Sequence, residues 1–418
     1  MSGSTSAAPR AAEHRVGRAF IGLYALAYLS TALLFVAPLL VTLALKINAL
    51  VGLERAPANL SLVTGVGALV AMVANPICGG LSDRTTSRFG RRRPWMIAGL
   101  VGGTVGILVV ALAPNVAVVL LGWCVAQVFF NALLAAQVAV LPDQVPVAQR
   151  GTVAGVLGVC LPLASVGGTY VVNVFSGNEL AMFMVPCAIA GLFVVVFALA
   201  LDDRRLVPTE RAPWSFRRTL AAFYVDPRRH PDFMWAFVSR FLFVLAYALL
   251  VTYQAYYLLD QLGSAEGDVP RQIFLGTLAQ ASVVVVASLV GGRLSDRTGR
   301  RKVFVVAAAF VYGLSLFVVA AATDLGGFLV GMAISGLGFG LYMAVDLALV
   351  ADVLPDEDTV AKDLGVLNIA GALPFGIAPA IAPLILALAG GSYQVLYGVA
   401  GVCAVLAGVA ILPVRRVR

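Results

Sequence analysis

Charge is scarce in this chain of 418 residues. Only 12% of its residues are charged and 61% are hydrophobic, whereas about 25% of the residues of a soluble domain are charged. The apolar residues form runs of about 18 to 28 residues, which are long enough to cross a bilayer as helices. The runs lack the period-two alternation of membrane β-strands. We therefore expect an all-α integral membrane protein, because lipid offers backbone groups no other partners.

Residues that bind metals or act as nucleophiles are also few. His14 and His230 fall in polar segments, and all five cysteines lie in apolar runs without the spacing of a metal site or a disulfide framework. The sequence contains no HExxH, GxSxG or nucleotide-binding pattern. We therefore expect no cofactor, no metal, no catalytic residue and no direct use of ATP.

A short phrase occurs twice in the chain. The letters SDRT are followed by GRRR at 90–93 in the first copy and by GRRK at 299–302 in the second. The shift from Asp83 to Asp296 is 213 residues, and the phrase Leu-Pro-Asp recurs at the same shift, ending at Asp143 and Asp356. A common shift indicates a duplicated chain, and two like halves in a membrane protein are typical of transporters.

Twelve apolar runs are predicted to span the membrane. The longest polar interruption divides them six and six, so we expect a tail at 1–18, a six-helix bundle at 19–201, a central loop at 202–232, a second bundle at 233–413 and a tail at 414–418. The predicted spans are 19–45, 59–81, 94–113, 115–141, 151–175, 180–201, 233–259, 271–294, 302–322, 325–351, 363–388 and 392–413.

The basic residues predict the orientation of the chain. Of the 29 Lys and Arg, 25 fall in the tails and in loops on one side of the predicted membrane. Only Lys46, Arg55 and Arg271 fall on the other side. The positive-inside rule places both termini and the central loop in the cytoplasm of a multi-pass protein of the cell membrane. The net charge of +8 is explained by this topology, so we expect no nucleic-acid partner.

The duplicated phrase carries a family resemblance. Gly79-x-x-x-Asp83-Arg84 and Gly292-x-x-x-Asp296-Arg297 each lie between the second and third span of a half. They resemble the signature loop of the major facilitator superfamily. In the first copy Asp83 and Gly90 are seven residues apart, and this longer form is similar to that of the sucrose–proton symporters and the glycoside–pentoside–hexuronide group.

The resemblance implies the architecture and the mechanism. Two pseudo-symmetric six-helix bundles would rock about a central site and carry a small-molecule substrate, a sugar or glycoside, together with a proton. The six motif residues would form a cytoplasmic gate. For the neighbouring Arg91, Arg92 and Arg93 we expect only a topological role and contact with anionic lipid. We expect a monomer whose only other partner is membrane lipid.

Very few charges lie inside the predicted spans. Arg240 lies about 10 Å from the cytoplasmic end of span seven, and Asp346 about 12 Å from the same end of span ten. In the family fold both spans line the cavity, so we predict an ion pair or a water-mediated link, with Asp346 as the protonatable coupling group. The alternative is that Arg240 reaches back to the surface. The symporters are expected to carry charges in spans four and five, which this chain lacks there.

Neutral polar and aromatic residues suggest the substrate class. Rings suit the apolar face of a sugar and amides suit its hydroxyls. Static packing is the alternative for each residue, and for Tyr256 and Tyr257 we expect a belt at the membrane interface. The candidate substrate-binding residues are Tyr24, Tyr28, Gln127, Asn131, Tyr253, Gln254 and Asn368.

Two other functions remain open. Proton-driven efflux of drugs or metabolites is favoured by the mostly apolar spans and by a faint likeness of the segment 155–168 to the span-five motif of drug–proton antiporters. An intramembrane enzyme would use the acidic residues around Asp352 and Asp356 to bind magnesium, but the matching region of the first half offers only Asp143. We interpret this acidic cluster as a solvated loop.

Overall fold

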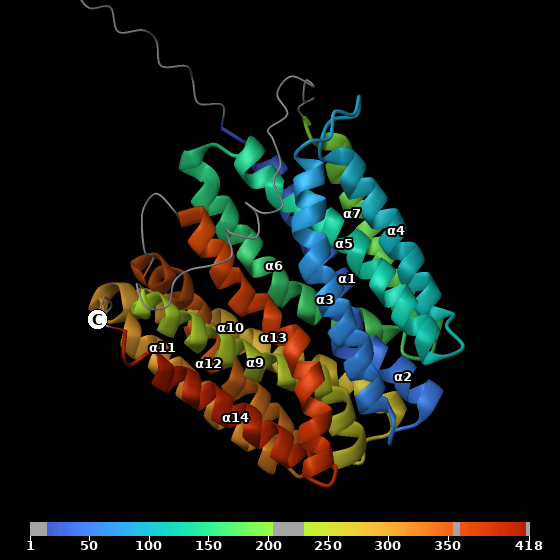
Figure 1. Ribbon diagram of the computed structural model, residues 1–418, viewed down its shortest axis with the longest axis vertical. Helices are drawn as coiled ribbons and strands as arrows, with labels where there is room; N and C mark the ends of the chain where they lie inside the picture. The colour runs from blue at the N-terminus through green and yellow to red at the C-terminus, as the bar shows by residue number, and fades with distance from the viewer. Residues whose placement is uncertain (1–14, 204–229, 354–359, 415–418) are drawn as a thin grey trace, which may run out of the picture.

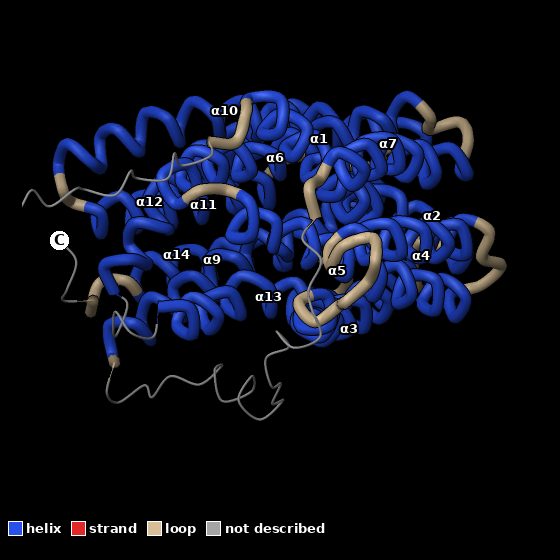
Figure 2. The backbone as a smooth tube through the Cα atoms, turned by 90° about the horizontal axis from the view of Figure 1, so that it is seen from above, coloured by secondary structure: helices blue, strands red, loops and turns tan. Residues whose placement is uncertain are grey.

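The computed structural model describes residues 15–203, 230–353 and 360–414, and within these ranges it is built of helices without a strand (Figure 2). The predicted central loop lies largely outside the described residues, as do most of the two tails. The elements are α1 (Arg18–Ala37), η1 (Pro38–Thr42), α2 (Leu43–Val51), α3 (Ala56–Ser82), α4 (Arg93–Ala111), α5 (Val116–Gln144), α6 (Val147–Val174), α7 (Glu179–Ala200), α9 (Pro231–Tyr256), η3 (Tyr257–Gln261), η4 (Glu266–Asp268), α10 (Val269–Thr298), α11 (Arg301–Ala321), α12 (Leu325–Val353), α13 (Val360–Leu388) and α14 (Tyr393–Ala410).

Twelve helical segments of the described chain are long and apolar enough to span a membrane, which confirms the predicted all-α class and the number of spans. The first span is longer than predicted and runs from Arg18 to Val51. Lys46 does not end it, because its ammonium group donates to the carbonyl of Ala111 at 2.9 Å and lies 2.8 Å from Glu179 Oε1. The helix ends instead before Gly52, whose φ of 75° is left-handed.

The helices pack as two similar groups, α1 to α7 and α9 to α14 (Figures 1 and 2). In the first group α4 packs on α5 and α7, α3 packs on α5, and α1 packs on α6 and α7. Under the repeat shift the same contacts recur in the second group, where α11 packs on α12 and α14, α10 packs on α12, and α9 packs on α13 and α14. Two symmetric seams, α3 with α13 and α6 with α10, join the groups.

The outer surface of both groups is apolar. Large aliphatic side chains stand exposed along the spans, including Leu192 at 61%, Leu199 at 72% and Leu388 at 83%. A soluble protein does not leave so much apolar surface in water, whereas lipid solvates it. The composition and the surface therefore agree on a multi-pass membrane protein.

Glycine allows close approach at the main helix contacts. A Cβ atom at Gly106 of α4 would lie 2.6 Å from the backbone nitrogen of Ala126 on α5, and one at Gly340 of α12 would lie 2.7 Å from the carbonyl oxygen of Val284 on α10. Small residues let helices pack closely in lipid, and these glycines do so at the contacts of α4 with α5 and of α12 with α10. Gly151 and Gly155 do not serve this purpose, because a Cβ at either position would meet open space.

Gly106→Ala is expected to destabilise the first group of helices. The added methyl group must push two backbones apart, which costs about 1–3 kcal/mol. Gly191→Ala is the matched control, because Gly191 also lies inside a helix but has open space around its Cβ position. It is expected to be neutral or to stabilise by up to about 1 kcal/mol. Thermal unfolding in detergent, followed with a thiol-reactive dye, measures both; equal midpoints would contradict the packing argument.

Candidate functional site

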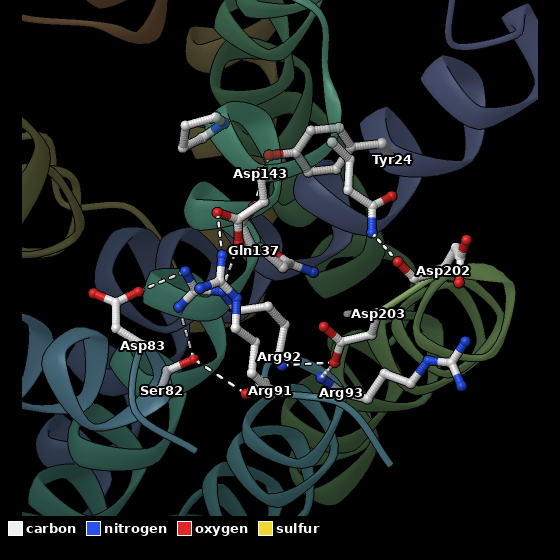
Figure 3. A network of polar contacts seen from close by, with 12 residues as sticks. Tyr24, Ser82, Asp83, Arg91, Arg92, Arg93, Gln137, Asp143, Asp202 and Asp203 are labelled. Carbon is white, nitrogen blue, oxygen red and sulfur yellow. Dashed lines mark hydrogen bonds and ion pairs between the residues drawn. The ribbon is translucent and has the colours of Figure 1, made fainter. Parts of the chain in front are cut away.

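Charged side chains form a network at the loop between α3 and α4, here called the arginine-rich end (Figure 3). Arg92 is 4% exposed, and its Nη2 lies 2.5 Å from Asp83 Oδ1 while its Nε donates to Asp143 Oδ2 at 2.9 Å. Its Nη1 donates to the hydroxyl of Ser82 at 3.0 Å. Arg91 adds a contact of 2.5 Å to Asp143 Oδ1. The network ties the ends of α3, α4 and α5 together, so the expectation of a merely topological, lipid-facing role is wrong for Arg92.

A third carboxylate, from the residues that follow α7, anchors the same loop. Asp203 Oδ2 accepts the backbone N–H groups of Arg92 at 2.7 Å and Arg93 at 2.8 Å. These are among the first amides of α4, which have no partner within the helix and favour a negative charge. The approach requires Gly90, because its φ is 99° and a Cβ there would lie 2.2 Å from Asp203 Oδ2.

The other predicted gate residues make fewer close contacts than Asp83. Gly79 and Gly292 lie at ordinary contact distance from Ala135 and Ala344, since a Cβ would be 3.7 Å and 3.9 Å from them. The side chain of Arg84 is not free, because it has an interaction partner in the structure. Arg297 is exposed near the end of α10, before Gly299 in the left-handed conformation. The side chain of Asp296 lies outside the described residues, as do those of the acidic cluster at 352–363.

Arg92→Gln is expected to lower the midpoint of thermal unfolding below that of the wild type and of the control variant. It removes the cation that Asp83 and Asp143 share. Removing one partner of a buried pair costs about 3–5 kcal/mol, and less here because Asp83 is 58% exposed and Arg91 still pairs with Asp143. Arg88→Gln in the same loop is the control, because the Arg88 guanidinium rests over the exposed ring of Phe89. The midpoints of thermal unfolding measure the difference; a midpoint for Arg92→Gln equal to that of the control would contradict the assignment.

The structure brings Arg240 and Asp346 together. Arg240 Nη1 donates to Asp346 Oδ2 at 2.8 Å, and the side chains are 20% and 7% exposed. The arginine comes from α9 and the aspartate from α12, as the matching depths in the sequence predict. Tyr342, one turn before Asp346, is hydrogen-bonded to the same carboxylate. Gly371 of α13 lies against the other edge of the guanidinium, since a Cβ there would be 3.6 Å from Nη2 and 3.8 Å from Nε.

A cluster of aromatic rings lies beside this ion pair and is absent from the sequence-based candidates. The ring of Tyr247 stacks on Phe339 with centroids 4.7 Å apart and meets Phe375 edge-on at 6.1 Å. All three side chains are partly exposed. Tyr247 follows Arg240 by seven residues and Phe339 precedes Asp346 by seven, so each ring shares a helix face with its charge. That spacing is the sequence signal that points to them.

The amides predicted in the first group cluster on α5. Asn131 Nδ2 donates to the carbonyl of Gln127 at 2.8 Å and to its side-chain oxygen at 3.1 Å, and Asn131 Oδ1 accepts from Asn75 of α3 at 3.2 Å. Tyr24 is fully buried, donates to the carbonyl of Gln137 at 2.7 Å and stacks on Phe197. Tyr28 is half-buried on the same helix. In this conformation Tyr24 packs within the first group.

Contacts between the two groups gather at the end opposite the arginine-rich end, where the groups converge in Figure 1. Tyr253 shares a hydrogen bond with Ser61 of α3, and the hydroxyl of Tyr256 donates to the carbonyl of Ala44 at 3.1 Å. Asn48 donates to Glu266 Oε1 at 2.6 Å. We call the end of the protein that holds these three contacts the closed end.

The expected interfacial belt of Tyr256 and Tyr257 is wrong. Both side chains are 0% exposed, and the hydroxyl of Tyr257 donates to the carbonyl of Val319 at 2.7 Å. Buried tyrosines keep their hydroxyl groups satisfied in this way. Gln254 is also buried, with a side-chain oxygen that has no partner among the described residues. The side chain of Asn368 lies outside the described residues.

Comparison with solved structures finds the same architecture. A mutant of the nucleoside transporter NupG superposes with a TM-score of 0.73 at 12% identity, covering 94% of this chain and 99% of that one. A bacterial homologue of the human lysosomal transporter Spinster, in an inward-facing and unoccupied conformation, gives a TM-score of 0.65 at 15% identity, covering 95% and 96%. At these identities the likeness shows the fold.

Sequence comparisons identify the family. A segment of 56 residues is 39% identical to the general alpha-glucoside permease of Schizosaccharomyces pombe, but it covers only 13% of this chain and 10% of the permease. The model of the Major Facilitator Superfamily matches residues 19–278 and 269–418, which is nearly the whole chain. With two groups of six spans, joined by two symmetric seams, this protein belongs to the major facilitator superfamily and is a transporter of small solutes.

Proposed function

We propose that this transporter moves a sugar or glycoside across the cytoplasmic membrane together with a proton, by alternating access. The observation that carries the proposal is the Arg240–Asp346 ion pair, which lies between α9 and α12 beside a partly exposed aromatic cluster. A charge within a span costs about 2.5–3.5 kcal/mol, so such residues are usually functional. The pair is therefore the best candidate for coupling.

Protonation of Asp346 is the coupling step. The ionised carboxylate holds Arg240, and a proton neutralises the carboxylate and releases the guanidinium. Because Asp346 is only 7% exposed, a proton would have to reach it from one side of the membrane in this conformation and from the other side after the closed end has opened. Binding of substrate and proton would then favour the same conformational change.

Polar and aromatic side chains support a polyhydroxylated substrate. Tyr247, Phe339 and Phe375 offer ring faces, while Gln127 and Asn131 offer amides from the other group. The partial match to an alpha-glucoside permease and the longer form of the first signature loop favour a sugar. NupG carries nucleosides, which also contain a sugar ring. Tyr24, Tyr28, Tyr253, Gln254 and Asn368 remain proposed contacts of other conformations.

The arginine-rich end is proposed to face the cytoplasm, with both termini on that side. The contacts at the closed end then make this conformation inward-facing. We propose that the gate residues Asp83, Arg84, Asp296 and Arg297 engage the other half when the arginine-rich end closes. Gly79 and Gly292 would permit the approach. A single chain is the proposed transport unit.

Proton movement in proteoliposomes tests this function. A pH dye outside the vesicles reports alkalinisation when a sugar enters with a proton, and a panel of mono- and disaccharides identifies the substrate class. Protein-free liposomes and a protonophore are the controls. Silence across the panel, for protein that is monodisperse and thermally stable, would reject sugar–proton symport. A panel of lipophilic cations on inverted proton gradients then tests efflux, the alternative function.

A further inference from the structure

Three amide side chains in the first group of helices form a directed chain of hydrogen bonds. Asn131 Nδ2 donates to the backbone carbonyl of Gln127 at 2.8 Å and to its side-chain oxygen at 3.1 Å, while Asn131 Oδ1 accepts from Asn75 Nδ2 at 3.2 Å. A backbone carbonyl can only accept a hydrogen bond, so it fixes which end of the Asn131 amide carries the nitrogen. The orientation of the other two amides then follows from that of Asn131.

The chain ends in two groups of opposite kind that have no partner among the described residues. Because Asn131 engages Gln127 Oε1 and Asn75 Nδ2, the free atoms are a donor, Gln127 Nε2, and an acceptor, Asn75 Oδ1. Gln127 is 8% exposed and Asn75 is partly exposed. Neither free atom is buried, whereas Nε1 of Trp123, one turn earlier on α5, is both buried and unpartnered. Both ends of the chain are therefore open to a ligand.

Asn75 lies on the face of α3 that turns toward the second group. Ser61 and Ala68 precede it by fourteen and seven residues, which places all three on one side of the helix. Ser61 shares a hydrogen bond with Tyr253, and a Cβ at Gly376 would lie 3.4 Å from the Cβ of Ala68. Asn75 continues this face by about 10 Å toward the arginine-rich end. Its free oxygen is thus placed between the two groups, where a transported solute has to pass.

We infer that Asn75 is a specificity-determining residue, whose Oδ1 accepts a hydrogen bond from a substrate hydroxyl group while Gln127 Nε2 donates to a substrate oxygen. This inference rests on the proposed transport of a sugar and adds to it a residue that is absent from the sequence-based candidates. A hydroxyl group can both donate and accept, so two hydroxyls of one sugar ring satisfy both ends of the chain. An ionised carboxylate has no hydrogen to offer Asn75.

The test uses methyl glucoside and its monofluoro analogues, in which fluorine replaces the hydroxyl group at C2, C3, C4 or C6. Fluorine is close to a hydroxyl group in size but cannot donate a hydrogen bond. Each analogue competes with the uptake of radiolabelled methyl glucoside into proteoliposomes whose outside is more acidic than their inside. For at least one analogue, we expect the wild type to need about tenfold more than of unlabelled methyl glucoside for half-inhibition.

Two substitutions separate contact with the substrate from a structural role of Asn75. Asn75→Ala removes the free acceptor and is expected to reduce the discrimination against that analogue to less than about threefold. Asn75→Asp keeps an oxygen acceptor in either protonation state and is expected to keep the discrimination of the wild type, although its ionised form cannot donate to Asn131. Asn59→Ala on the same helix is the control, because that amide donates to the carbonyl of Arg55 at 2.8 Å, outside the chain.

The outcomes distinguish this inference from the proposed function. Equal discrimination in the wild type and in Asn75→Ala overturns the inference and leaves sugar symport standing. Loss of discrimination in Asn75→Asp as well as in Asn75→Ala assigns it to the order of the amide chain and also overturns the inference. A wild type that accepts all the analogues as well as methyl glucoside does the same. If methyl glucoside does not enter with protons, the proposed function and the inference fail together.

Discussion

Covalently bridging position 48 to position 266 is expected to lower the rate of transport by more than about tenfold. Asn48 and Glu266 meet at 2.6 Å across the two groups of helices at the closed end. Alternating access requires this contact to separate in every cycle. Asn48→Cys with Glu266→Cys, in a background without the five native cysteines, can be joined by a short bis-thiosulfonate reagent. Uptake is then measured before and after the bridge is reduced.

The controls for this bridge lie at the same end of the protein. Each single cysteine variant is treated with the same reagent, which shows the effect of modification without a bridge. Lys46→Cys with Glu179→Cys places a bridge within the first group only, where the two side chains lie 2.8 Å apart. That bridge is expected to leave transport unchanged. Full activity of the bridged 48–266 variant would show that the closed end does not open during transport.

Asp346→Asn is expected to abolish proton-driven accumulation while exchange of substrate across the membrane persists. The amide keeps the size of the carboxylate and its contact with Arg240, but it cannot take up a proton. Uphill uptake under a pH gradient should therefore fall to the level of protein-free vesicles. Counterflow of labelled against unlabelled substrate, which needs no proton gradient, should remain within about threefold of the wild type at its optimum and lose its dependence on pH.

Asp268→Asn is the matched control for the coupling variant, because Asp268 is an exposed carboxylate beyond the closed-end side of the spans. It is expected to accumulate substrate as the wild type does. Substrate-driven proton flux that survives in Asp346→Asn with its pH dependence intact would remove Asp346 from the mechanism. The proton would then have to be carried elsewhere, or another ion would be coupled.

Much of the architecture follows from features that are local in the sequence. Twelve apolar runs specify twelve spans because a helix of that length and composition is more stable in lipid than in water. The shared shift of 213 residues predicts two like groups. The meeting of Arg240 and Asp346 could be expected from their similar depths, because two opposite charges inside neighbouring spans have few other partners.

The rest depends on contacts that no local pattern records. The burial of Arg92 comes from Asp143 and Asp203, which lie about 50 and 110 residues away in the sequence. The buried hydroxyl groups of Tyr256 and Tyr257 are satisfied by backbone carbonyl groups. Because every residue has a carbonyl group, the sequence carries no signal for this burial. The aromatic cluster could have been found, because Tyr247 and Phe339 each lie seven residues from a charge.

The wide helical turns of the first span of each half have a mechanical consequence. η1 at Pro38–Thr42 and η3 at Tyr257–Gln261 are π-helical, and each lies where its span approaches the closed end. π turns are rare inside α-helices and are among the places where helices kink. We expect the two π-helical turns to bend more easily than the α-helices that precede them. Asn48 and Glu266 lie beyond the two turns, so bending there can separate this contact, whereas Tyr253 and Tyr256 lie before η3 and leave the first group only when the bundles rotate.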